Sequence, residues 1–226
     1  MEKRKIESVA WDLQVQIWKD RWALWPDGPP EPIEMLDPEI AAKILEIHYE
    51  RHEELPLISR RDSRTEVAGL VDRQARKIAV AQKFGLEVER FTGGHEVGHW
   101  MLHPGEVMHR DRPMQGVTID RSLRNPVERE ADYFSACFLV SENMLRDEFK
   151  RRFLTESHLE FDDSTAFWLC PQDPDSVFGQ GPLERAVTVA SARTFGGGVF
   201  DSLAKRFRVS TSTMAIRLLE IGIIGR

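Results

Sequence analysis

An HEVGH segment at residues 95–99 limits the possible structure and chemistry of this chain of 226 residues more than any other feature. Positions four apart lie one turn apart on the same side of an α-helix, so the imidazoles of His95 and His99 can each reach one metal ion at about 2.0–2.1 Å. Glu96 is turned about 100° from His95, where its carboxylate can reach a water on the metal without binding the metal itself. A helix with this pattern is typical of zinc sites in peptidases.

The residues around this segment indicate a helix that turns both histidines inward. The two histidines share an apolar stripe at helical spacing with Val88, Phe91 and Leu102. A stripe of this kind faces the protein core. We therefore expect a helix within residues 85–102 and a buried metal site on its inner face.

A catalytic zinc site needs a third protein ligand, and the residues directly after the motif do not supply it. Position 105, where metzincins carry their third histidine, is glycine. His103 follows His99 by four residues, but three ligands in a row on one helix would spread over about 12 Å, too far to converge on one ion. His103 is therefore interpreted as a packing residue or as a residue that contacts a metal ligand.

The best candidate for the third ligand lies on a second predicted helix, which opens at Asn125. Glu128 and Asp132 are four apart and share one face of this helix. Glu128 can therefore bind the metal, while Asp132 accepts a hydrogen bond from the far ring nitrogen of a ligand histidine. Two alternatives stay open: Glu130 as the ligand, and a capping box between Asn125 and Glu128.

The rest of the chain is organised by its prolines and aromatic residues. Residues 1–32 hold four of the six tryptophans and a proline-rich end, and are predicted to form an extension with a linker. Residues 33–226 are predicted to form one domain, with an irregular insertion at 155–182 and a helix-turn-helix-like tail at 200–226. The periodicity of the extension fits a strand or a helix, and its tryptophans are expected to pack onto the main domain.

Two short strands, at residues 65–72 and 77–81, are predicted to form a hairpin. The second is expected to lie at a sheet edge, where an extended peptide could add a strand. His48 and His52 are also four apart, but their neighbours are charged, so they are assigned to the solvated face of a helix.

The composition excludes several classes of protein. No stretch approaches the roughly 18 unbroken apolar residues of a membrane span, and the N-terminal residues lack the pattern of a signal peptide. Two cysteines fit a reducing cytoplasm better than a disulfide framework. The net charge of −6 offers no general attraction to nucleic acid. We therefore expect a cytoplasmic, soluble protein without a membrane or nucleic-acid partner.

The motifs GHEVGHWMLH and EREADYFSACFL together resemble those of the ImmA/IrrE-type metallo-endopeptidases. They are also similar to the wider gluzincin pattern HExxH…ExxxD. The resemblance covers about residues 67–145 and the tail LAKRFRVSTSTMAIRLLEIGII. It implies an α+β fold: a mainly helical zincin-like peptidase domain with a small β-sheet beside the HExxH helix and a C-terminal helix-turn-helix-like pair.

For the site, the resemblance implies one Zn²⁺ per chain, bound by His95, His99 and Glu128. It also implies Glu96 as the catalytic base and Asp132 as the partner of a ligand histidine. Manganese stays open as an alternative ion.

The sequence departs from the family pattern at Gly93 and Gly94, where larger residues are usual, and at Ser141, where proline is frequent. Each glycine costs a helix interior about 1 kcal/mol relative to alanine, so we expect a close approach of another backbone there.

The expected function is that of a zinc-dependent endopeptidase with a protein substrate. The resemblance implies a selective regulatory protease that cleaves a helix-turn-helix transcriptional repressor in a stress response or in mobile-element transfer. One alternative is a DNA-binding regulator, because residues 199–226 carry five basic and two acidic side chains, although no dimerisation element is evident. Another is a scaffold that keeps the metal site without turnover.

Overall fold

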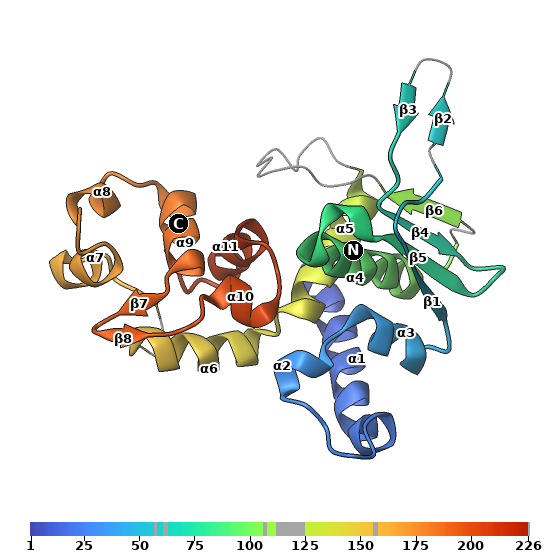
Figure 1. Cartoon of the computed structure of the whole chain (residues 1–226), viewed down its shortest axis with the longest axis horizontal. Helices are drawn as coiled ribbons and strands as arrows, with labels where there is room; N and C mark the ends of the chain where they lie inside the picture. The colour runs from blue at the N-terminus through green and yellow to red at the C-terminus, as the bar shows by residue number, and fades with distance from the viewer. Residues whose placement is uncertain (57, 61–62, 106–107, 112–124, 156–157, 226) are drawn as a thin grey trace. The chain divides into compact units, whose positions relative to one another are not determined.

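The computed structural model describes residues 1–56, 58–60, 63–105, 108–111, 125–155 and 158–225. Contacts divide the chain into two compact units, Met1–Leu139 and Val140–Arg226 (Figure 1). The division falls within the predicted domain 33–226, and the predicted domain boundaries stay a prediction.

The first unit packs helices against a four-stranded sheet, with α4 between the sheet and α5 (Figure 1). Its helices are α1 (Lys3–Leu24), α2 (Pro32–Met35), α3 (Pro38–Ile44), the short 3-10 helix η1 (Gln82–Phe84), α4 (Leu86–Leu102) and α5 (Pro126–Leu139). Its strands are β1 (His48–His52), β2 (Ile58–Arg60), β3 (Ser63–Thr65), β4 (Gly69–Asp72), β5 (Lys77–Ala81) and β6 (Met108–Asp111). The sheet order is β1-β5-β4-β6, and β2 pairs with β3 alone. A mainly helical α+β domain with a small sheet beside the HExxH helix is confirmed.

The predicted hairpin is present as β4 and β5, which pair antiparallel. β5 is an inner strand, because β1 pairs with it in parallel on its other side. The prediction that β5 lies at a sheet edge is therefore wrong, and β1 and β6 are the outer strands. His48 and His52 lie in β1 and not on a helix. The segment HYERH has no apolar alternation, so its strand depends on pairing with β5 and not on a local pattern.

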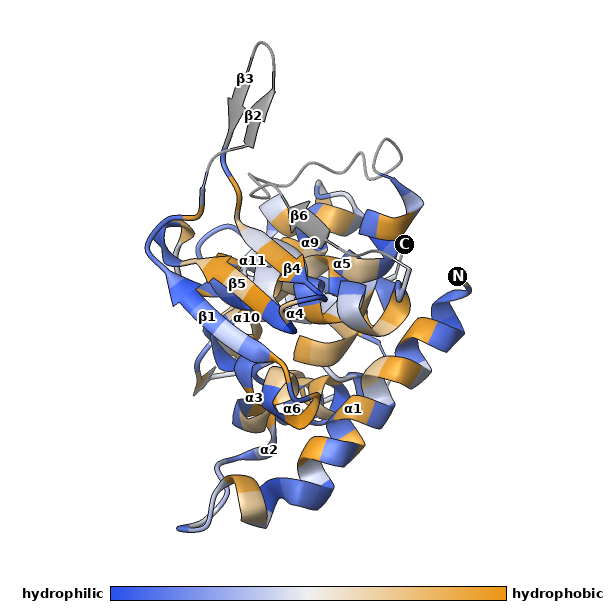
Figure 2. Ribbon diagram, turned by 90° about the vertical axis from the view of Figure 1, so that its right-hand side faces the viewer, coloured by the Kyte–Doolittle hydropathy of each residue, from blue (hydrophilic) through white to orange (hydrophobic). Residues whose placement is uncertain are grey.

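The N-terminal segment, whose periodicity fits a strand or a helix, is a helix: α1 covers Lys3–Leu24 (Figure 2). Its buried face packs on α5 and consists of Ile6, Ala10, Leu13, Gln14 and Ile17. The Gln14 amide donates to the carbonyls of Cys137 and Phe138, at 3.0 and 2.9 Å, and so satisfies two acceptors at the end of α5.

Three tryptophans of α1 do not pack as expected. Trp11, Trp18 and Trp22 are 49%, 47% and 60% exposed, on a side of the helix turned away from its buried face. The interpretation that these aromatic residues pack onto the main domain is wrong for these three. Arg21 lies over the Trp18 ring, with its guanidinium carbon 4.1 Å from the ring centroid.

The glycines of α4 let its neighbours approach its backbone closely, as their cost in a helix predicts. A Cβ at Gly98 would lie 3.1 Å from the Phe134 ring and 3.2 Å from the Ala131 Cα, both on α5. A Cβ at Gly94 would lie 2.6 Å from the Ser135 hydroxyl, and one at Gly93 would overlap the Tyr49 hydroxyl of β1. Small residues at these positions therefore set how near α5 and β1 come to the helix.

The first turns of α4 are fixed by a group of charged side chains. Arg90 pairs with Asp37, which also accepts a hydrogen bond from the Glu39 amide at 3.0 Å as the N-cap of α3. Arg51 of β1 donates to Glu89 at 2.6 Å. Burial is the main cause that raises the pKa of the neighbouring Tyr49 phenol well above its ordinary value, so this hydroxyl stays neutral. The start of the motif helix is thus tied to both α3 and β1.

The second unit consists of short helices and a two-stranded hairpin. Its elements are α6 (Glu142–Phe153), α7 (Asp163–Leu169), α8 (Asp175–Phe178), α9 (Pro182–Ser191), β7 (Thr194–Phe195), β8 (Gly198–Val199), α10 (Leu203–Phe207) and α11 (Thr211–Glu220). Residues 155–182, predicted as an irregular insertion, contain α7 and α8. Asp162 caps α7 by accepting a hydrogen bond from the Thr165 amide at 2.8 Å.

The helix-turn-helix-like pair of the tail is confirmed as α10 and α11. Arg208 turns the chain between them in the left-handed region, with φ 53°, and Ser210 caps α11. No helix among the described residues is both long and apolar enough to cross a membrane.

Candidate metal centre

The two histidines of the motif face each other from successive turns of α4, as their spacing predicts. Their Nε2 atoms lie 2.9 Å apart, and the side chains of His95 and His99 are 1% and 0% exposed. At this distance the Nε2 lone pairs of two buried imidazoles repel each other unless a proton or a metal ion lies between them.

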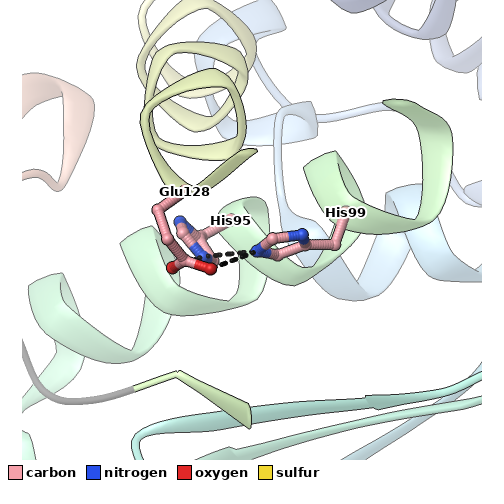
Figure 3. A group of neighbouring side chains, drawn as sticks. All are labelled: His95, His99 and Glu128. Atoms are coloured by element: carbon pink, nitrogen blue, oxygen red, sulfur yellow. Dashed lines mark hydrogen bonds and ion pairs between the residues drawn. The ribbon is translucent and has the colours of Figure 1, made fainter. Parts of the chain in front are cut away.

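Glu128, from the first turn of α5, completes the arrangement (Figure 3). Its carboxylate oxygens lie 3.5 Å from the Nε2 of His95 and 3.7 Å from the Nε2 of His99. The three donor atoms lie within 4.8 Å of one another, a group that could hold a metal ion. The structure therefore brings together the three residues that the sequence analysis predicts as ligands.

The spacing of these atoms fits a divalent metal. Ligands bound tetrahedrally at about 2.0–2.1 Å lie about 3.3–3.4 Å from one another. The two Nε2 atoms lie 2.9 Å apart, and the nearest oxygens of Glu128 are Oε2 at 3.5 Å from His95 and Oε1 at 3.7 Å from His99, on both sides of this value. Two imidazoles and one carboxylate are also a donor set that catalytic zinc sites use, and they leave a fourth position for water.

Asp132 lies one turn after Glu128 on α5, and its Oδ1 is 2.9 Å from the Nδ1 of His95. A carboxylate accepts hydrogen bonds, so the proton of this imidazole is assigned to Nδ1. That assignment leaves the Nε2 lone pair of His95 directed at the centre of the group. The structure thus places Asp132 beside the candidate ligand His95, where the sequence analysis expects it.

Replacing Asp132 with Asn is expected to weaken affinity for a divalent metal by about 10–100-fold. Asn keeps the volume of the buried side chain but is a weaker acceptor, and it no longer selects one orientation and tautomer of the ring. Competition with a chromophoric chelator measures the change. Asp12→Asn, on the exposed side of α1, is the control. An unchanged affinity in Asp132→Asn would show that Asp132 does not orient the histidine.

Glu96 lies next to the sheet in a fully buried position, with 0% of its surface exposed. Gly69 of β4 makes room for it, because a Cβ at position 69 would overlap the carboxylate and methylene of Glu96 and the Thr92 methyl. The sequence analysis missed this role of Gly69. A glycine inside a predicted strand is the signal that could have found it, since it marks a close approach of another group.

We expect Gly69→Ala to lower the free energy of unfolding by about 1–3 kcal/mol, because the added methyl must displace Glu96 or separate β4 from α4. Urea denaturation measures this change. Gly105→Ala is the matched control: a Cβ there meets open space, so its effect should stay within about 0.5 kcal/mol. Equal stability of the two variants would contradict the packing of Gly69 on Glu96.

The end of α4 is held by residues that are not candidate ligands. His103 is the C-cap residue, and its Nδ1 lies 3.1 Å from the Nδ1 of His99. Its Nε2 lies 3.1 Å from the Oε2 of Glu130. Glu130 is therefore directed at His103, and the alternative that it replaces Glu128 in the group of three finds no support in this geometry.

Arg73, in the turn between β4 and β5, caps the same end of the helix. Its guanidinium donates to the carbonyls of His99, Trp100 and His103 at 2.8, 2.7 and 3.1 Å. These carbonyls lie at the C-terminal end of the helix, where intrahelical donors run out, and that of His99 also accepts a hydrogen bond from the His103 amide at 3.0 Å. The sequence analysis missed Arg73, because its contacts depend on where the hairpin meets the helix.

Residues 60–160 match the family model Peptidase_M78, described as the IrrE N-terminal-like domain. The match contains α4, α5 and all three residues of the candidate metal centre. A comparison with curated proteins gave no match. The family supports a metallopeptidase type of function. Over residues 60–160, slightly under half of the chain, the protein is therefore similar to the IrrE N-terminal-like domain of metallopeptidases.

Proposed function

We propose that the chain is a zinc-dependent endopeptidase, with one Zn²⁺ held by His95, His99 and Glu128. The observation that carries the proposal is the convergence of these three donors beside the buried Glu96. A bound zinc ion would polarise the scissile carbonyl and lower the pKa of a coordinated water towards about 7.

The residues of the chain have separate tasks in this proposal. Asp132 holds the ring of His95 so that Nε2 faces the centre. Glu96 accepts a proton from the attacking water and donates it to the leaving nitrogen of the substrate. Its burial beside Gly69 keeps bulk water away from the carboxylate and fixes where it points.

We further propose that the enzyme is selective and cytoplasmic, and that its substrate is a helix-turn-helix transcriptional repressor, as the resemblance implies. A selective protease needs surfaces that dock its substrate away from the scissile bond. The exposed tryptophans of α1 and the exposed aromatic residues Phe167, Trp168 and Phe178 of the second unit are available for such contacts.

The alternative of a DNA-binding regulator has less support. A recognition helix needs an exposed face that can enter the major groove. Every residue of α11 is buried or partly buried, and Arg217 is 3% exposed, with its guanidinium donating to the Val140 carbonyl. In the pair α10–α11 and its turn, Lys205 and Arg208 are the exposed basic residues, too few for strong contact with phosphates.

The test is to incubate zinc-loaded protein with casein and with cytosolic extract, and to map new termini by mass spectrometry. We expect few cleavage sites, confined to one or a few proteins of the extract. Broad digestion of casein would reject selectivity and leave a general peptidase. Bound zinc without any cleavage in either sample would favour the scaffold alternative.

A further inference from the structure

The contacts of His99 continue through two residues outside the group His95, His99 and Glu128. The Nδ1 of His99 lies 3.1 Å from the Nδ1 of His103, and the Nε2 of His103 lies 3.1 Å from the Oε2 of Glu130. We propose that His103 and Glu130 form a hydrogen-bonded pair that positions His99 for metal binding. This inference rests on the proposed zinc site.

The direction of each hydrogen bond follows from the requirement that His99 binds a metal. If Nε2 of His99 carries the lone pair that faces the group of three, its proton is on Nδ1. That N–H then donates to Nδ1 of His103, which must be unprotonated to accept it. The proton of His103 is therefore on Nε2, where it donates to the Glu130 carboxylate.

Glu130 thus selects the tautomer of His103, and His103 selects the tautomer of His99. Asp132 does the same for His95 in a single step, at 2.9 Å. A carboxylate of α5 therefore orients each of the two histidines of α4. Asp132 contacts His95 directly, and Glu130 acts on His99 through the imidazole of His103.

The pair is held firmly enough to orient a ligand. The side chains of His103 and Glu130 are 10% and 18% exposed, which limits competition from water. Arg73 donates to the carbonyl of His103 and to that of His99, so the backbone of both residues is fixed. The second oxygen of Glu130 pairs with the amino group of Met1.

Three variants separate a positioning role from a general effect on stability. His103→Phe removes the acceptor for Nδ1 of His99, and we expect zinc affinity to fall about 10–100-fold. In His103→Asn, the side-chain oxygen can take the place of Nδ1, and we expect affinity within about threefold of wild type. Glu130→Ala should weaken affinity about 10-fold, because His103 then loses its preferred tautomer.

A double-mutant cycle tests the link between the two residues. Glu130→Ala should have no further effect in the His103→Asn background, since an amide oxygen needs no partner to select its acceptor form. Zinc affinity is measured by chelator competition. The visible absorption of Co²⁺-loaded protein reports whether the geometry of the ligands changes, which a merely structural role would not alter.

His52 and Glu50 provide a matched control, because the same two groups pair at 2.8 Å on β1, away from the metal centre. His52→Phe and Glu50→Ala should leave zinc affinity and the Co²⁺ spectrum unchanged. Unfolding of each metal-free variant by urea shows that all of them fold.

Several outcomes would overturn the inference. Wild-type affinity in His103→Phe would show that His99 needs no partner at Nδ1. An equal loss from Glu130→Ala in both backgrounds would show that Glu130 acts by another route, and complete loss of metal would make it a ligand. Wild-type protein that binds neither Zn²⁺ nor Co²⁺ would instead reject the proposed function, and the positioning pair with it.

Discussion

Replacing Glu96 with Gln is expected to leave the protein folded and metal-loaded but to reduce peptide hydrolysis by about 10²–10⁴-fold. The amide has nearly the same volume as the carboxylate, which matters because Gly69 leaves no spare room around this side chain. It cannot accept a proton from the attacking water, so the nucleophile is no longer activated. The metal ligands are unchanged, because Glu96 is not one of the three converging donors.

This prediction is checked by measuring zinc content, urea unfolding and the cleavage rate of one identified substrate for the same preparations. Glu87→Gln is the matched control, since Glu87 is exposed on the first turn of the same helix. Hydrolysis at the wild-type rate by Glu96→Gln would contradict the proposed role of Glu96 as the base. Loss of zinc from this variant would mean that Glu96 takes part in binding the metal.

The candidate metal centre could be predicted from the sequence because it depends on two short spacings. His95 and His99 share a face of one helix, and Glu128 and Asp132 share a face of another, and helix geometry alone determines both relations. The prediction then needs only that these two faces meet. Gly94 and Gly98 allow this meeting, and the cost of glycine in a helix indicates such a close approach at Gly94.

The surroundings of the centre depend on pairings between distant segments, which no local pattern reveals. β1 is polar and short, so its sequence does not indicate that it pairs with β5. This pairing makes β5 an inner strand. Arg73 contacts the end of α4 only because the hairpin carries it there. The exposure of Trp11, Trp18 and Trp22 also goes against the ordinary tendency of large aromatic residues to be buried.

Replacing any one of His95, His99 and Glu128 with Ala is expected to abolish stoichiometric zinc in the purified protein. Three convergent donors leave one position for water, and removal of one donor leaves only two protein ligands for the ion. The loss should exceed that of Asp132→Asn, which changes the orientation of a ligand and not the number of ligands. Catalysis should disappear together with the metal.

Metal analysis by mass spectrometry after gel filtration measures this loss, and wild-type protein should carry about one zinc per chain. His48→Ala is the control for the histidines, because His48 is exposed on β1.

Glu128→Ala and Glu130→Ala together decide which carboxylate of α5 is the ligand. Glu128 is 3.5 and 3.7 Å from the two Nε2 atoms, whereas Glu130 contacts His103, so the first variant should lose zinc and the second should retain it with weaker affinity. Full zinc in Glu128→Ala and none in Glu130→Ala would reverse the assignment and remove the basis of the positioning pair.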